Sequence, residues 1–118
     1  MTHFIALLIV LLPLTAAAEE PVIENVAVTR TAPETYRFSV TISHPDTGWD
    51  HYADGWRVLD MDGNELGIRV LFHPHETEQP FTRSLDGVKI PTGTTQVQVQ
   101  ARDLPAGWNA GTIVVDLR

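Results

Sequence analysis

Histidine is the residue type that points most specifically to one chemistry in this sequence of 118 residues, because imidazole is the commonest protein ligand for Zn(II) and Cu(II). Two histidines flank Pro74, where an extended backbone would put both rings on one face. Two more lie in the stretch 44–51 beside two aspartates, whose carboxylates could bind the same ion or orient a ring. We therefore predict a site for Cu(II) or Zn(II), with the following ligands: His44, His51, His73, His75 and Asp50.

Two other interpretations of the same residues stay open. In the first, the histidines are structural: the His-Pro pairs form turns, Asp46-Thr47-Gly48 forms an Asx-type turn, and the rings bond to loop backbone. In the second, this part of the molecule recognises a carbohydrate or a protein through large amphipathic side chains, namely Trp49, Tyr52 and Trp108. Apart from a metal ion, we predict no cofactor.

Familiar catalytic motifs are absent from the sequence. It contains no Gly-x-Ser-x-Gly elbow, no glycine-rich phosphate loop and no His-Glu-x-x-His pair. Two aspartates, Asp50 and Asp54, lie near His51, but no nucleophile accompanies them. We therefore expect a binding protein and not an enzyme.

The elements that must position these residues are predicted to be β-strands. Residues 36–43 alternate apolar and polar side chains with the period of two that is typical of a strand with one buried face. The segment 66–72 follows the same pattern if Leu66, Ile68, Val70 and Phe72 face inward. Together the alternating and β-branched segments predict seven strands, at residues 22–29, 36–43, 56–59, 66–72, 81–85, 96–102 and 113–117. Seven short strands favour an all-β, immunoglobulin-like sandwich.

The predicted topology gathers the histidines at one end of the sandwich. When strands run alternately up and down, the loops after the second, fourth and sixth strands emerge at the same end. The second of the seven strands is followed by His44 and His51, and the fourth by His73 and His75. We therefore expect this loop end to hold the binding site, with a metal ion, a small ligand or a protein as its partner.

Two kinds of resemblance accompany this pattern. Residues 85–97, in which a Leu, a Pro and a Gly precede an alternating strand, resemble the corner between the fifth and sixth strands of fibronectin type III and related immunoglobulin-like domains. The stretches 44–56 and 73–85 resemble a group of small exported bacterial proteins of uncharacterised function. The first resemblance implies a fibronectin type III-like sandwich, and the second implies export without supplying an activity or a site.

The N-terminal segment is predicted to be a secretory signal peptide. An apolar run over residues 4–14 precedes Ala16-Ala17-Ala18, so we expect a signal peptide at 1–18 and one domain at 19–118. The product is then periplasmic or secreted, and it does not insert into the membrane after cleavage. Its net charge of -7 disfavours nucleic acid and anionic membranes as partners, and the absence of cysteine excludes disulfides and thiolate sites. The oligomeric state does not follow from the sequence.

Overall fold

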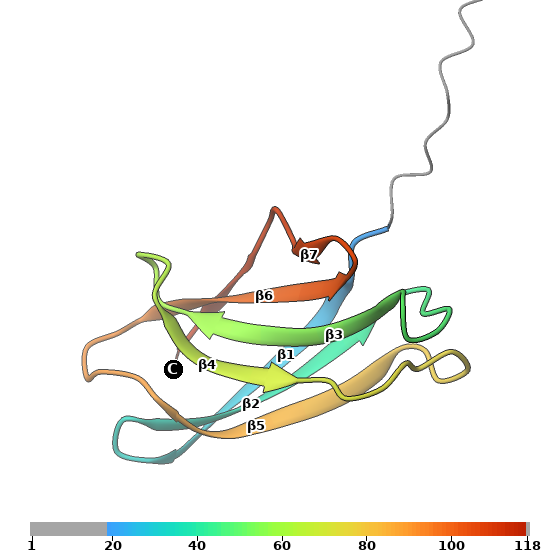
Figure 1. Cartoon of the computed structure of the whole chain (residues 1–118). Helices are drawn as coiled ribbons and strands as arrows, with labels where there is room; N and C mark the ends of the chain where they lie inside the picture. The colour runs from blue at the N-terminus through green and yellow to red at the C-terminus, as the bar shows by residue number, and fades with distance from the viewer. Residues whose placement is uncertain (1–18, 118) are drawn as a thin grey trace, which may run out of the picture.

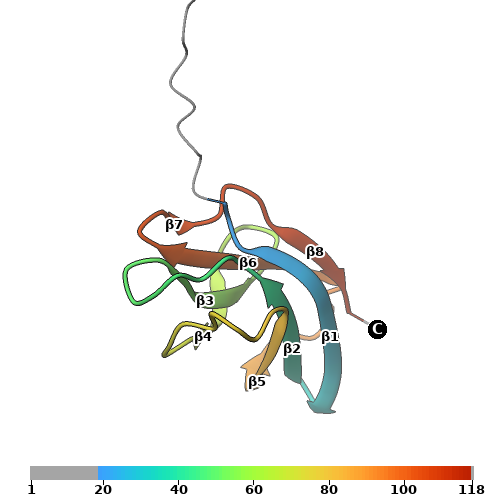
Figure 2. The same ribbon diagram turned by 90° about the vertical axis from the view of Figure 1, so that its right-hand side faces the viewer.

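The computed structural model describes residues 19–117, which form two antiparallel β-sheets packed face to face (Figures 1 and 2). The predicted signal peptide at 1–18 lies outside the described residues. Within residues 19–117 there is no helix, and so none that is long and apolar enough to cross a membrane. The predicted all-β sandwich architecture is therefore confirmed.

Eight strands make up the two sheets: β1 (Val22–Ala32), β2 (Thr35–Ser43), β3 (Tyr52–Leu59), β4 (Glu65–Val70), β5 (Phe81–Lys89), β6 (Gln96–Leu104), β7 (Gly107–Trp108) and β8 (Ile113–Asp116). The described residues thus contain one strand more than the seven predicted, because the chain adds the two-residue β7 before β8. Six prolines fall between strands, where their missing N–H groups cost no ladder bond: Pro33, Pro45, Pro74, Pro80, Pro91 and Pro105.

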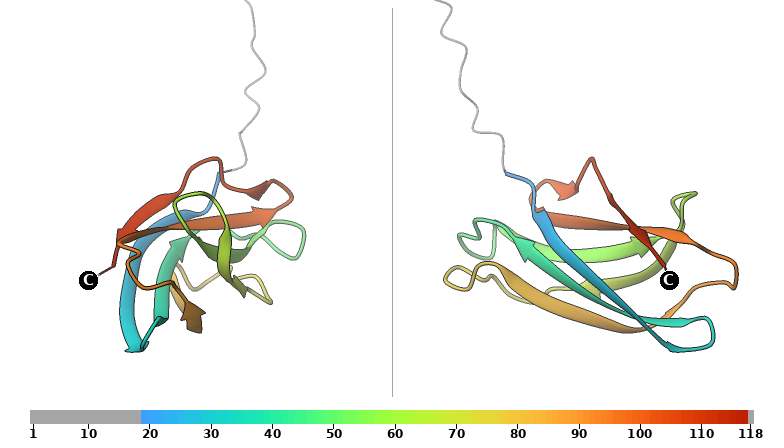
Figure 3. Two further views of the ribbon diagram at one scale, coloured as in Figure 1. Left: turned by 90° about the vertical axis from the view of Figure 1, so that its left-hand side faces the viewer. Right: turned by 180° about the vertical axis from the view of Figure 1, so that it is seen from behind.

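The smaller sheet has the order β1-β2-β5, and the larger has the order β4-β3-β6-β7 (Figure 3). Strand β8 also pairs with β6, so β7 and β8 follow one another along the same edge of that strand. The chain crosses between the sheets after β2, β4 and β5. The loops after β2, β4 and β6 all lie at the right-hand end in Figure 1.

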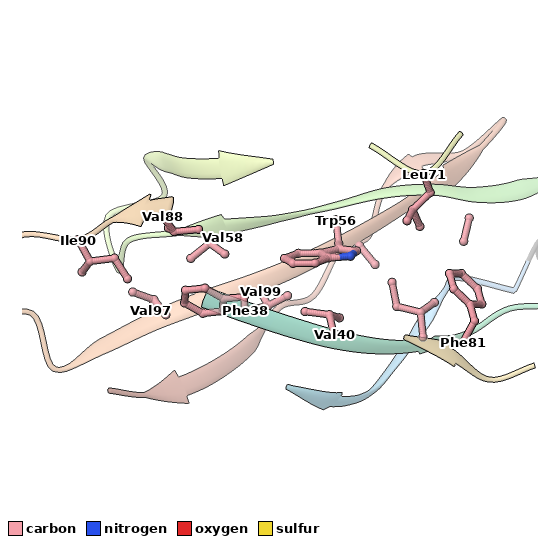
Figure 4. Close-up of a cluster of buried hydrophobic side chains, with 13 residues drawn as sticks. Phe38, Val40, Trp56, Val58, Leu71, Phe81, Val88, Ile90, Val97 and Val99 are labelled. Carbon is pink, nitrogen blue, oxygen red and sulfur yellow. The ribbon is translucent and has the colours of Figure 1, made fainter. Parts of the chain in front are cut away.

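The core fills the space between the sheets and follows the predicted alternation on β2 and β6. Phe38, Val40 and Ile42 point inward from β2, and Val97 and Val99 meet them from β6. Trp56 of β3 is fully buried in the middle of this cluster (Figure 4). Because apolar side chains interdigitate across both sheets, burial of this core is the main force that holds the sandwich together.

The predicted register of the fourth strand is wrong by one residue. We expected Leu66, Ile68, Val70 and Phe72 to face the core, but Val70 is 36% exposed and Phe72 is 71% exposed, whereas Leu71 is only 3% exposed. The cause is a pairing irregularity between Val58 and Leu59, which sets Gly67 opposite Val58 and makes Leu66 an extra residue. From Gly67 onward the odd-numbered residues face inward, and Ile68, Val70 and Phe72 face solvent.

Two alanine substitutions test this register. Leu71→Ala should lower the free energy of unfolding by about 2–5 kcal/mol, because it removes a buried side chain and leaves a cavity. Val70→Ala should change it by less than about 1 kcal/mol, because this side chain already contacts water. Denaturant unfolding of both variants checks the expectation, and a larger loss for Val70→Ala than for Leu71→Ala would contradict the observed register.

Candidate metal centre

The candidate site lies at the loop end where β2 and β6 finish and β3 begins. His44 directly follows β2, His51 directly precedes β3, and Asp103 lies near the end of β6. The first of these residues is thus attached to the smaller sheet and the other two to the larger sheet. A contact among them joins the two layers of the sandwich at this end.

His44 is held between two carboxylates in the protein interior. Its Nδ1 lies 2.5 Å from Oδ1 of Asp46, and its Nε2 lies 3.1 Å from Oδ2 of Asp103. None of these three side chains is exposed to solvent. Burial of ionisable groups is costly unless each is paired and hydrogen-bonded, so the three residues depend on one another.

The ring of His44 faces two acceptors, and this limits its chemistry. An ionised carboxylate can only accept hydrogen bonds, whereas a neutral imidazole carries a single N–H. Both contacts are satisfied if the ring carries two protons, if one carboxyl group holds a proton, or if a metal ion replaces the proton between Nε2 and Asp103. In the last case Asp46 would orient the ligand ring through its other nitrogen, an arrangement common around metal-bound histidines.

Asp46 also fixes the surrounding loops. Its Oδ1 accepts a hydrogen bond of 3.0 Å from the backbone N–H of Ala53, at the start of β3. Its Oδ2 accepts one of 2.7 Å from the backbone N–H of His75, in the loop after β4. This buried carboxylate therefore holds the loop after β2, the start of β3 and the loop after β4 in one arrangement around His44.

His51 and Asp103 complete a group that could hold an ion. One nitrogen of His44, one nitrogen of His51 and one oxygen of Asp103 all lie within 4.8 Å of one another. Zn–N and Zn–O bonds are about 2.0–2.2 Å long and zinc sites are usually tetrahedral, which sets the donors of one ion about 3.4 Å apart, so the donors of this group must move closer together to bind one ion. Among residues 19–117 it is the one such group of three or more donors.

Two side chains of this group have donor atoms that are available to bind an ion. Oδ1 of Asp103 is buried and has no hydrogen-bond partner within the described part of the chain. His51 is half-buried, and its Nδ1 lies 3.3 Å from Oγ1 of Thr47, which leaves Nε2 as the nitrogen with no such contact. A buried, unpaired carboxylate oxygen is uncommon in folded proteins and calls for a partner.

The structure places the other predicted ligands outside this group. Asp50 and His73 are exposed, and neither contributes a donor atom to it. His75 is buried, but its ring stacks on Phe81 with centroids 4.0 Å apart, and its Nε2 accepts a hydrogen bond of 2.9 Å from Arg83. The rings of His73 and His75 do approach each other, with centroids 5.0 Å apart.

Sequence reasoning missed Asp103, although the sequence contains a signal for it. The inward-facing residues of β6 are Val97, Val99 and Ala101, and the same period of two continues to Asp103. A charged residue at an inward-facing position is informative, because charged side chains are almost never fully buried unless they are paired. Continuing the strand to its last inward position would have identified this residue.

The aromatic residues of the alternative interpretation lie in two places. Trp49 is 67% exposed in the loop after β2 and contacts Tyr52 edge-on, with ring centroids 5.8 Å apart. Trp108 lies on β7 and stacks with two arginines, Arg57 at 3.8 Å and Arg102 at 4.9 Å from the ring centroid. Trp49 and Tyr52 are thus neighbours of His51 along the chain, whereas Trp108 packs against the outward side chains of the larger sheet.

The environment of His75 predicts a pH dependence of stability. Burial lowers the pKa of His75, and Arg83 and His73 lower it further, whereas Glu78 and Asp46 oppose the shift. The folded protein therefore binds fewer protons at this residue than the unfolded chain does below pH about 6.5, and stability is lost as the pH falls.

Replacing His75 with Gln removes this contribution. The stability advantage of the parent over His75→Gln should shrink between pH about 7.5 and about 5.5, as measured by urea unfolding at each pH. An advantage that stays constant or grows as the pH falls would show that the pKa of His75 is not lowered in the folded protein.

Comparison with known proteins gives one informative relative. A protein of Halomicrobium mukohataei named "Putative lipoprotein" is 47% identical to this chain over 79 residues, which is 67% of this chain. The match spans 38% of that protein, well under two thirds of its length. No protein-family model matches the chain, and no solved structure matches it.

Proposed function

We propose that the protein is an exported binding domain that holds a divalent transition metal, Zn(II) or Cu(II), between His44, His51 and Asp103. The observation that carries this proposal is the buried carboxylate of Asp103, which has an unpaired oxygen beside two imidazole rings. The proposed ligand set therefore keeps His44 and His51 from the sequence-based prediction. It replaces His73, His75 and Asp50 with Asp103.

The chemistry of these donors suits the proposed ions. Two imidazole nitrogens and one carboxylate oxygen are typical ligands of Zn(II), and imidazole also binds Cu(II). Asp46 would orient the ring of His44 through Nδ1, which leaves Nε2 for the ion. Because His51 is only half-buried, a further ligand such as water could reach the ion from that side.

The wider setting of the site is also part of the proposal. We propose a periplasmic or secreted protein, and the name of the relative supports an exported location. The strand order, the buried Trp56 on the third strand and the link between β2 and β6 support a fibronectin type III-like or immunoglobulin-like sandwich. We propose binding without catalysis, with a metal ion as the partner.

Calorimetric titration with Zn(II) and Cu(II) tests the site directly. His51→Ala should weaken binding at pH about 7 by more than tenfold, because it removes one of three protein ligands from a half-buried position. Asp103→Asn should do the same, because the amide keeps the shape of the side chain but loses its charge. Binding to the parent should weaken below pH about 6.5, where protons compete for the imidazoles.

His73→Ala is the matched control for His51→Ala. It also removes an imidazole from the loop end, but it takes no donor from the proposed group, so its affinity should equal that of the parent. If His73→Ala loses affinity and His51→Ala does not, the ligand set is wrong. If the parent binds neither ion below millimolar concentration, the metal function is wrong.

A second candidate function rests on Trp49, which is 67% exposed beside Tyr52. An exposed indole next to a second aromatic ring can stack on a sugar or on a partner protein. A parent protein that binds no metal but is retained on immobilised glycans would favour this alternative.

A further inference from the structure

Two arginines face inward at the β4–β5 border, where the outermost strand of the larger sheet lies beside that of the smaller sheet (Figure 1). Arg69 of β4 pairs with the buried Trp56 of β3, and Arg83 of β5 pairs with the buried Val40 of β2. Because residues directly paired in a ladder share one face of their sheet, both arginine side chains leave the backbone toward the core. Inward positions of a sandwich are normally apolar, so two arginines there call for an explanation.

The two arginines lie opposite each other across the β4–β5 border. A Cβ atom at Gly67 of β4 would lie 3.1 Å from Leu85 and 3.4 Å from Val88, so β4 and β5 are in contact at this point. Arg69 follows Gly67 by two residues, and Arg83 precedes Leu85 by two residues. Because the two strands run in opposite directions, both steps lead toward the loop end (Figure 1).

The next inward residues support this alignment. Leu71 follows Arg69 by two residues, and Phe81 precedes Arg83 by two residues. Both are buried members of the core, and they lie on facing sides of the space between the sheets at the same end (Figure 4). The side chains of Arg69 and Arg83 therefore approach the same part of the border from its two sides.

The guanidinium of Arg69 lies at the free edge of β4. The N–H of Leu71 donates a hydrogen bond of 2.9 Å to the carbonyl oxygen of Asp54, so the backbone of Leu71 faces β3. The bonding direction alternates along an antiparallel strand, and the carbonyl of Val70 therefore points away from β3. Nη1 of Arg69 donates a hydrogen bond of 3.2 Å to this carbonyl, which holds the guanidinium on the side of β4 that borders β5.

The positive charge of these two groups is poorly compensated. Among residues 19–117, Arg69 forms no ion pair with a carboxylate, and its buried Nε has no hydrogen-bond partner. Arg83 has one carboxylate nearby, that of Glu78 at 3.5 Å, and the side chain of Glu78 is 61% exposed. Nη2 of Arg83 donates a hydrogen bond of 2.9 Å to Nε2 of His75, and a nitrogen that accepts a hydrogen bond holds no proton, so His75 adds no positive charge. The border thus carries two positive charges against one solvated negative charge.

We propose that Arg69 and Arg83 together bind a phosphate or sulfate group at the β4–β5 border. A guanidinium offers parallel N–H groups that match two oxygens of an oxyanion. A tetrahedral anion has two opposite pairs of oxygens, so it can meet one guanidinium from β4 and one from β5, whereas a carboxylate has a single pair. A phosphate monoester also carries a charge of about -1.5 to -2 at neutral pH, which balances two arginines better than a carboxylate does. The site shares no residue with the proposed metal ligands and does not depend on them.

The affinity should be modest. The net charge of -7 opposes the approach of any anion, and both arginines are partly exposed, so water competes for their N–H groups. We therefore expect a Kd on the order of 1 mM for inorganic phosphate or sulfate.

Titration of the metal-free, nitrogen-15-labelled protein with sodium phosphate and sodium sulfate tests the proposal, with sodium chloride keeping the ionic strength constant. The Nε–H signals of Arg69 and Arg83 in NMR spectra should shift together and saturate, and that of Arg37 should not. Arg69→Gln should weaken binding by about tenfold or more, and Arg69→Lys should lose most of it too, because lysine keeps the charge but lacks the planar fork. Arg37→Gln is the matched control, since it removes the same charge from a half-exposed position on the outer face of the smaller sheet.

Glycerol 3-phosphate in place of inorganic phosphate distinguishes the two sources of the anion. Binding at least as tight as that of inorganic phosphate supports a phosphate group carried on a larger molecule. Clearly weaker binding supports the free ion as the ligand.

Three results would overturn the proposal. One is the absence of a saturable shift up to about 50 mM phosphate and sulfate. Another is unchanged binding by Arg69→Gln, and the third is an equal loss in Arg37→Gln, which would indicate an adventitious ion only. Thermal unfolding of each variant in chloride alone separates lost binding from lost fold, and Arg83→Gln gives an independent test from the side of β5.

Discussion

Three ionisable side chains buried without solvent contact set the constraint on which the loop end of this protein depends. Asp46, His44 and Asp103 are each costly to bury alone, and the ring of His44 pairs with both carboxylates. The contacts among these three side chains connect the end of β2 to the end of β6 and so join the two sheets. Through the backbone N–H of His75, Asp46 also holds the loop after β4. Removing His44 would leave Asp103 buried without its hydrogen-bond partner and Asp46 bonded only to backbone N–H groups among residues 19–117.

This link occupies an informative place in the fold. In antibody domains the second and sixth strands of the sandwich are joined by a disulfide. The present chain has no cysteine, and polar contacts make the connection between β2 and β6 at one end of the core. A metal ion bound there would bridge the same strands, so occupancy and the stability of the sandwich would be linked.

Much of the fold follows from the sequence, because one buried face per strand imposes a period of two. The alternation at β2 and β6 predicted their inward residues, and the order of the strands placed the four histidines of residues 19–117 at one end. The register of β4 could not be predicted, because the even-numbered residues form the more apolar face of this segment, yet Ile68, Val70 and Phe72 face solvent. The pairing irregularity at Val58 and Leu59 decides between them.

The candidate metal ligands were harder to predict than the end of the molecule at which they lie. Whether a histidine is available as a ligand depends on what its ring contacts, and the ring of His75 stacks on Phe81 and accepts a hydrogen bond from Arg83 at Nε2. Asp103 and the exposed apolar run from Ile68 to Phe72 are two places where residue type and facing direction disagree. One is a charge that faces inward and the other is an apolar run that faces outward. Such conflicts tend to occur at functional positions, and the proposed metal site rests on the first of them.

The most direct measurement is the anomalous scattering of crystals grown with Zn(II) and recorded at the zinc absorption edge. The proposed metal site predicts one strong peak within bonding distance of Nε2 of His44, a ring nitrogen of His51 and a carboxylate oxygen of Asp103. The contact between His44 and Asp103, 3.1 Å in the present structure, should open to admit the ion. A peak at His73 and His75 instead, or no peak with that contact unchanged, would contradict the proposed site.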